Sequence, residues 1–314
     1  MTQAKTQTDP IPATTERLRR WFRRAAVASL VANIGIIVTG GAVRLTDSGL
    51  GCPTWPRCTE ASYTPHGELG LHGAIEFGNR LLTFVVAAVV IACWALALVV
   101  HRRAKAANAD AADRRPLVLS TLIALGVPLQ AVIGGVTVLT DLNPYVVALH
   151  LLASMAIVGL CVWLIDLLGG PSRTAAPPVL RWLAIAVFLV GWVVLWLGTV
   201  VTGSGPHSGD LESRRTGLDP RLMSHVHAWS VYALVALTVA LIVLALRAER
   251  SGRSQQQPLL PAAVTLLTVE LAQGLIGFVQ YFTDLPELLV GLHMLGAGVT
   301  AAAIAWVLVR SRAR

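Results

Sequence analysis

Three histidines lie inside apolar stretches of this sequence, where an imidazole is uncommon and needs a polar partner. If the stretches are spanning helices, His150, His227 and His293 lie at a similar depth, one to two turns from the same membrane face. Two imidazoles at matched depth on neighbouring helices can supply both axial ligands of a heme iron. The alternative is that each histidine only hydrogen-bonds to a neighbouring helix.

A second polar group occurs in "LHGAIEFGNRLL", residues 71 to 82. His72, Glu76 and Asn79 are spaced i, i+4 and i+7, which places them on one stripe of a helix. Glu76 could therefore transfer protons at a site within the membrane. Arg80 is within reach of a propionate or of an acidic partner, so a structural Glu76 to Arg80 pair is the alternative.

Two of the four cysteines stand in "CPTWPRC", residues 52 to 58. The spacing between Cys52 and Cys58 is not the CxxC of a zinc or redox motif. A disulfide that closes the loop, structural or redox-active, is the favoured interpretation, and free thiols are the alternative. Cys93 and Cys161 lie in apolar stretches and are expected to be small core residues.

These residues must be positioned by membrane helices, because the composition excludes a soluble globular domain. Hydrophobic residues make up 55% of the 314 residues, charged residues make up 13%, and the mean hydropathy is +0.66. Apolar runs of about 20 residues, enough to cross a bilayer, recur eight times. They lie near 25–43, 71–100, 117–139, 146–168, 181–203, 223–247, 259–282 and 288–310.

The positions of lysine and arginine predict the orientation of these spans. Of the 25 basic residues, 19 lie in the N-terminal segment, near 101–116, 169–181 and 247–257, or at the C-terminus. Basic residues collect on the cytoplasmic side, so both termini are expected there and residues 52–58 are expected outside, where a disulfide persists. The net charge of +8 therefore reports topology, and no nucleic-acid partner is expected.

The chain contains an internal repeat at an offset of 143 residues. It aligns "QAVIGGVTVLTDLNPYVVALHLL" (130–152) with "QGLIGFVQYFTDLPELLVGLHML" (273–295), including both glutamines and both histidines. We expect Gln130 and Gln273 to hydrogen-bond between helices. Glu270 has no counterpart in the first half and is assigned no role.

The repeat predicts an all-α integral membrane protein built as two tandem four-helix bundles. Each unit has an even number of spans, so a pseudo-twofold axis along the membrane normal is expected. The expected segments are a cytoplasmic stretch 1–24, a first half 25–168, a linker 169–180 and a second half 181–314.

Four motifs together resemble the heme A synthase family over essentially the whole chain. They are "GGAVRLTDSGLGCPTWPRC" (40–58), "IEFGNR" (75–80), "QAVIGGVTVLT" followed by His150, and "GLHMLGA" (291–297). The resemblance implies a bacterial plasma-membrane enzyme that oxidises a methyl group of heme O to a formyl group, giving heme A for cytochrome oxidase. It also implies a permanent heme b in the second half and a site for the substrate heme in the first.

Carried over residue by residue, the resemblance makes His227 and His293 the ligands of the heme b iron. His150 would bind the substrate heme, Glu76 would be the catalytic group, and Cys52 with Cys58 would match the outer cysteine pair of many members. This chain has Asn79 where most members have a histidine, so His72 is considered as a substitute ligand in a substrate pocket that also includes Arg80. The outer loop between the fifth and sixth spans carries no cysteines.

Heme O synthase would be a delivery partner by the same implication, whereas the redox partner and the oligomeric state stay open. Two other classes of protein compete with the enzyme. A b-type cytochrome that only transfers electrons would explain the histidines but not the polar residues Glu76 and Asn79 of the first half. A transporter is disfavoured because the polar groups cluster at the outer ends of the spans, not at broken helices in mid-membrane.

Overall fold

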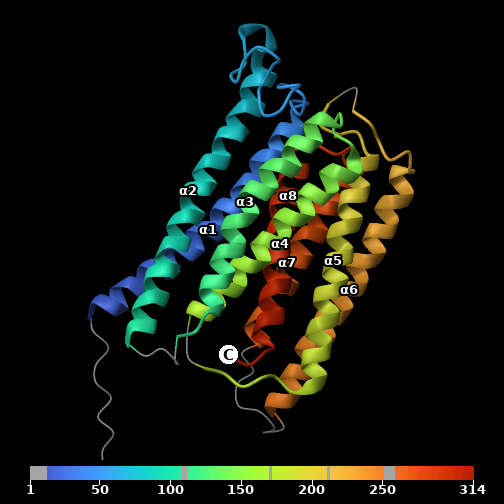
Figure 1. Cartoon of the computed structure of the whole chain (residues 1–314). Helices are drawn as coiled ribbons and strands as arrows, with labels where there is room; N and C mark the ends of the chain where they lie inside the picture. Colours follow the sequence, from blue (N-terminus) through green and yellow to red (C-terminus); the bar gives the residue numbers. More distant parts are fainter. Residues whose placement is uncertain (1–12, 108–111, 170–171, 211–212, 251–258) are drawn as a thin grey trace, which may run out of the picture.

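The described residues form eight long α-helices and one short 3-10 helix. A computed structural model of the chain describes residues 13–107, 112–169, 172–210, 213–250 and 259–314 (Figure 1). The helices are α1 (Ala13–Leu45), α2 (Gly70–Ala107), α3 (Arg115–Leu139), α4 (Pro144–Leu168), α5 (Pro178–Ser204), α6 (Pro220–Arg250), α7 (Leu260–Phe282) and α8 (Glu287–Arg310), and the 3-10 helix η1 is Gly67–Leu69. All eight α-helices are long and apolar enough to cross a membrane, which confirms the predicted spans.

The helix ends follow from local sequence. Pro144, Pro178 and Pro220 each begin a helix, where the missing N–H of proline costs nothing and its fixed φ suits the first turn. α1 begins twelve residues before the predicted apolar span, because the arginine-rich segment before residue 25 continues as helix. Parts of the expected segments 1–24 and 169–180 lie outside the described residues.

The internal repeat is confirmed in local geometry. The Thr-Asp-Leu triplets 140–142 and 283–285 follow α3 and α7, and their Asp and Leu residues have φ of 52° and 54° in the first copy and 57° and 57° in the second. In both triplets the threonine hydroxyl donates to the backbone four residues earlier at 2.7 Å. The same residues therefore make the same left-handed turn in both halves.

The helices pack as two bundles, and the core of the second extends to Ile37, Met155 and Val158 of the first. α1 and α3 contact α2 and α4, and in the same pattern α5 and α7 contact α6 and α8. Buried residues such as Val90 and Ile123 form the core of the first half, and Leu234 and Leu266 lie in that of the second. The halves meet through α4 against α8, α1 against α8, and α4 against α5. This contact pattern is unchanged when the halves are exchanged, and the twofold axis itself stays a prediction.

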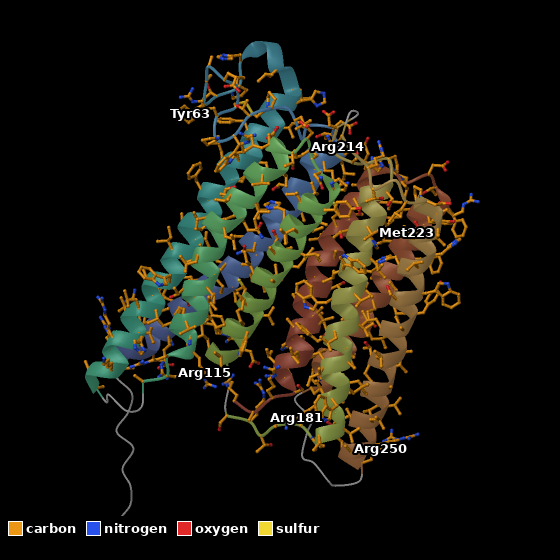
Figure 2. The ribbon with its side chains drawn as sticks, turned by 45° about the vertical axis from the view of Figure 1, so that its right-hand side comes forward. Tyr63, Arg115, Arg181, Arg214, Met223 and Arg250 are labelled. Atoms are coloured by element: carbon orange, nitrogen blue, oxygen red, sulfur yellow. A yellow bond between two sulfur atoms is a disulfide. The ribbon has the colours of Figure 1, made fainter. Side chains whose placement is uncertain are left out.

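The two ends of the bundle differ in charge. α1 begins and α8 finishes at one end, here called the termini end, and residues 46–69 lie at the other, here called the loop end (Figure 1). Figure 2 shows Arg115, Arg181 and Arg250 at the termini end, whereas Tyr63 and Arg214 lie at the loop end. The basic residues that predicted a cytoplasmic side thus gather at one end of the bundle, although its orientation in a membrane stays a prediction.

Polar contacts tie the halves together at both ends. At the loop end, Arg44 of the first half donates to the backbone oxygens of Thr202 and His207, at 3.0 Å and 2.5 Å. At the termini end, the buried Asp166 of the first half pairs with Arg310 of the second at 3.5 Å, and Arg173 of the linker donates to Asp166 and to the Val309 backbone oxygen, both at 2.6 Å. The relative position of the two sites described below is therefore fixed at both ends of the bundle.

Candidate functional site

The repeated histidines have matching surroundings in the two halves. His150 on α4 faces Gly134 on α3, where an added Cβ would lie 3.2 Å from Cε1 of the imidazole. His293 on α8 faces Gly277 on α7, where the corresponding distance is 3.5 Å. A glycine therefore leaves space beside each ring that a side chain would fill.

The repeated glutamines fix the backbone of these histidines. Gln130 Nε2 donates to the backbone oxygen of His150 at 3.2 Å, and Gln273 Nε2 donates to that of His293 at 3.0 Å. Each bond joins neighbouring helices, α3 to α4 and α7 to α8. The prediction of interhelical bonds is confirmed for both glutamines.

The second helix of each half carries a polar residue that also faces a glycine, but its type differs. On α6, the His227 ring lies 3.4 Å from the Cβ position of Gly198. On α2, Asn79 lies 3.8 Å from the Cβ position of Gly40. The hydroxyl of Thr39 donates to Asn79 Oδ1 at 2.8 Å, so the Asn79 amide has a protein partner.

The three imidazoles have the chemistry of heme ligands. The Nδ1 atoms of His150, His227 and His293 are buried and have no hydrogen-bond partner in the described part of the chain. A buried polar atom without a partner is costly, which indicates that these rings serve another group. Imidazole nitrogen suits iron, and a glycine beside each ring allows a flat group to approach the backbone, so the donor set fits heme.

The first residue of the α2 stripe, His72, lies apart from this set. His72 is exposed in the first turn of α2, and its Nδ1 lies 3.0 Å from the hydroxyl of Ser48. It is seven residues from Asn79, about 10 Å along the helix axis. The geometry therefore brings His72 to the loop end and not to the level of Asn79.

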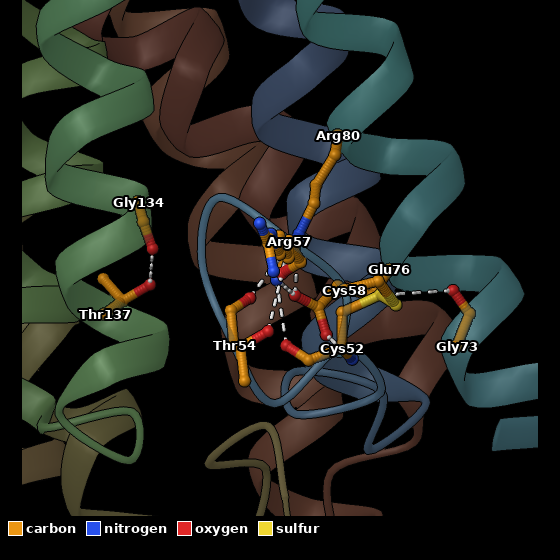
Figure 3. Close-up of polar contacts among 9 residues, drawn as sticks. All are labelled: Cys52, Thr54, Arg57, Cys58, Gly73, Glu76, Arg80, Gly134 and Thr137. Carbon is orange, nitrogen blue, oxygen red and sulfur yellow. Dashed lines mark hydrogen bonds and ion pairs between the residues drawn. A yellow bond between two sulfur atoms is a disulfide. The ribbon is translucent and has the colours of Figure 1, made fainter. Parts of the chain in front are cut away.

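Glu76 is buried, with 5% of its surface exposed, and both carboxylate oxygens are bound (Figure 3). Oε2 accepts a hydrogen bond from the backbone N–H of Cys52 at 2.6 Å. Oε1 accepts from Arg80, whose Nε lies at 3.1 Å, and the two side chains form an ion pair. The structural pair that the sequence offered as an alternative role for Glu76 is thus formed.

Arg80 also binds the loop between the two cysteines. Its Nη1 donates to the backbone oxygens of Thr54 and Arg57 at 3.0 Å and 3.2 Å, and its Nη2 donates to that of Cys52 at 2.9 Å. Residues 52–58, here called the disulfide loop, therefore close around one guanidinium group (Figure 3).

Cys52 and Cys58 form the predicted disulfide, and both residues are fully buried at 0% exposure. A thiol that attacks the bond would first need the loop to open, because thiol–disulfide exchange requires access to a sulfur. Cys93 and Cys161 are free and buried, as expected for core residues.

Trp55 of the disulfide loop packs on α3, a contact that sequence reasoning missed. A Cβ at Gly135 would collide with the Trp55 ring, whose Cγ would lie only 2.7 Å away. Gly135 follows the glycine that faces His150, so the loop packs on α3 at the level of that imidazole, on a face about 100° around the helix. The repeat held a signal for this contact, since Gly135 corresponds to Phe278 in the second half.

An open cavity of about 440 Å³ lies beside this contact. It is bordered by the disulfide loop and the last turn of α3, with Thr54, Arg57, Glu60, Val138 and Asp141 among its lining residues.

The second half has a buried carboxylate of a different kind. Glu270 on α7 is 3% exposed, and its Oε1 accepts a hydrogen bond from Thr238 on α6 at 2.8 Å. Its Oε2 is buried without a partner in the described residues. The corresponding residue of the first half is Val127. Glu76 and Glu270 are therefore not equivalent groups.

Comparison with known proteins matches the chain to one family and to several of its relatives. The COX15-CtaA family, described as cytochrome oxidase assembly protein, matches residues 23–71 and 71–206. A heme A synthase of Lysinibacillus sphaericus is 30% identical over 59% of this chain, and the chain spans 58% of that relative's length. Heme A synthases of Geobacillus thermodenitrificans and Rhizobium etli are 24% and 26% identical over 86% and 90% of this chain, covering 84% and 87% of their own lengths.

Proposed function

Because the chain belongs to the COX15-CtaA family of cytochrome oxidase assembly proteins, we propose that it is a heme A synthase. The proposed reaction is oxidation of a methyl group of heme O to the formyl group of heme A, in two successive steps. The likeness to heme A synthases along most of the chain supports this activity. The observation that carries it is the difference between the halves: two imidazoles with buried, unpartnered nitrogens in the second, and one such imidazole with a buried, doubly bound carboxylate in the first.

We assign a permanent heme b to the second half, where His227 and His293 would hold it. Their unpartnered Nδ1 atoms and the glycines beside the rings support this assignment. When bound, heme b supplies one-electron transfer. The protein holds the ligands in place through helix packing and through the bond from Gln273 to the His293 backbone.

The substrate heme is assigned to the first half, between α2 and α4. His150 is its protein ligand, and Asn79 occupies the place that a second histidine has in the other half. His72 is not assigned as a ligand, because it lies about two turns from Asn79 and contacts Ser48. A single strong protein ligand suits a heme that must leave after the reaction.

Glu76 is the proposed proton-handling group in the first half. The carboxylate lies beside the disulfide loop, which packs on α3 through Trp55, and its oxygens are held by Cys52 and Arg80. Oxidation of the methyl carbon requires proton movement at each step, and a carboxylate of fixed orientation can accept or return that proton. Heme O synthase, which makes the substrate, is the proposed delivery partner, and both termini are assigned to the cytoplasm.

The test is expression of the chain together with heme O synthase in a bacterium that lacks heme A. Hemes are extracted from the membranes and identified by chromatography. Heme A in this host, and its absence when the chain is omitted, is the expected result. Heme B and heme O without heme A, from well-folded protein, would instead favour a b-type cytochrome that only transfers electrons.

A further inference from the structure

We propose that Arg80 is a positioning residue that joins Glu76 and the disulfide loop into one unit, so that the Cys52–Cys58 bond fixes the catalytic carboxylate. This inference rests on the proposed function for the role of Glu76. It concerns how the carboxylate is held, and it assigns to the disulfide a part in catalysis that is distinct from electron transfer.

The guanidinium of Arg80 is fully committed to the protein. It donates to Glu76 Oε1 and to the backbone oxygens of Cys52, Thr54 and Arg57. Arginine has five N–H donors in a rigid, planar fork, and these four acceptors surround it. Arg80 therefore acts through Glu76 and the loop, not as a ligand of a heme propionate.

The carboxylate is held from two sides. Oε1 of Glu76 is bound by Arg80 on the same helix, and Oε2 is bound by the N–H of Cys52, which belongs to the loop. Rotation of the carboxylate would break at least one of these bonds. The position of Oε2 is therefore set by the loop, and Cys52 is itself one end of the disulfide.

The disulfide restrains a loop that has few backbone hydrogen bonds. The disulfide loop lies outside the helices, and its two cysteines are joined to the rest of the loop end by few backbone bonds, such as Cys58 N–H to Ser62 O at 3.0 Å. The covalent closure restricts the loop, so that three of its carbonyl groups converge on Arg80 at little further entropic cost. When the bond is reduced, we expect the loop to loosen and the hydrogen bond to Glu76 Oε2 to break in part of the population.

The purified full-length protein tests this inference with Arg80→Lys and Cys52→Ser/Cys58→Ser. Lysine keeps a positive charge beside Glu76 but cannot bind four acceptors in the geometry of arginine, and serine at position 52 keeps the backbone N–H. Arg57→Lys is the matched control, because the Arg57 side chain is exposed, donates to the Glu60 backbone oxygen and lies over the Tyr63 ring. Heme content, turnover, KM and the rate of disulfide reduction are measured. Mass spectrometry of the peptide with Cys52 and Cys58 reports reduction without interference from the other thiols.

Both test proteins should lose about 10- to 100-fold in kcat with unchanged heme content and KM, since small misplacement of a reacting group has effects of this size. Arg80→Lys should also make the disulfide reducible about tenfold faster, while Arg57→Lys should change neither quantity. Combining the Arg80 and cysteine changes should cost little more than either change alone, because the groups act as one unit.

The inference is overturned if the cysteine variant keeps wild-type kcat, if the losses multiply in the combined variant, or if disulfide reduction is equally slow in Arg80→Lys. Absence of heme A formation by the wild-type protein is a different result, which would refute the proposed function. Even then, the reduction rates decide whether Arg80 holds the disulfide loop closed.

Discussion

The two halves of this protein share one arrangement of helices but carry different polar side chains at corresponding places. The second half has His227 and His293, each with a buried, unpartnered Nδ1, and its segment between α5 and α6 contains no cysteine. The first half has His150 with Asn79 on the corresponding helix, and it adds Glu76 under a disulfide loop. In the proposed assignment, one copy of the duplicated unit holds a permanent cofactor and the other binds a substrate that enters and leaves.

The buried carboxylates of the two halves also differ in how they are bound. Glu76 is bound on both oxygens by a cation and a backbone N–H, whereas Glu270 is bound on one oxygen by a hydroxyl. Two fixed donors hold the Glu76 carboxylate in one orientation, as proton transfer to a bound substrate requires. The single bond from Thr238 to Glu270 instead joins α6 to α7.

The largest expected effect is loss of the second-half heme from His293→Ala. Loss of the His293 imidazole should abolish stable heme b binding, because it is one of the two protein ligands in the proposed assignment. Absorbance and heme extraction of purified protein measure this. His225→Ala is the control, since His225 is exposed and its ring contacts Tyr281. Wild-type heme b content in His293→Ala would refute the ligand assignment.

The next largest effect separates the two carboxylates. Glu76→Gln should lower turnover about 10²- to 10⁴-fold with heme b retained, as expected for loss of a proton-transfer group. Glu270→Gln should leave turnover within about threefold, because glutamine can still accept the bond from Thr238. Heme A formation per bound heme b is the measured quantity. Equal losses in both variants would show that the halves do not divide the chemistry as proposed.

Asn79→His should make the first half resemble the second. A histidine at this position faces Gly40 and can supply a second ligand opposite His150, so the substrate heme should be retained. We expect up to about a twofold rise in heme bound per chain when heme O is supplied, with a spectrum of two-histidine ligation. An unchanged heme content and spectrum would contradict the placement of Asn79 beside the substrate.

The smallest effect concerns the glycines beside the repeated histidines. A Cβ at Gly134 would lie 3.2 Å from the His150 ring, which is tight, whereas one at Gly277 would lie 3.5 Å from the His293 ring, which is an ordinary contact. Gly134→Ala should therefore lower turnover about threefold and Gly277→Ala should leave heme b content unchanged. The reverse order of effects would argue that the glycines do not set the space beside the rings.

The helical plan could be predicted from sequence because hydropathy and the repeat are strong, local signals. The spans, the repeated turns at 140–142 and 283–285, and the interhelical glutamines all follow from periodic or duplicated residues. The Glu76 to Arg80 pair was also within reach, because its i to i+4 spacing places the two side chains together on a helix.

The contacts of the disulfide loop could not be predicted in the same way. The bond from the Cys52 backbone to Glu76, the contact of Trp55 with Gly135 and the bond from Thr39 to Asn79 join segments without any periodic relation. They depend on how an irregular loop and separate helices pack, which propensity and spacing do not encode. In the sequence, only the difference between Gly135 and the aligned residue of the second repeat, Phe278, pointed to the loop contact.

The division of labour between the halves is tested most directly by identifying the hemes bound to purified His150→Ala, made in a host that produces heme O. The account predicts heme B at the wild-type level, with heme O and heme A lost, because His150 serves only the substrate heme. Loss of heme B together with the other hemes, or wild-type amounts of heme A, would contradict it.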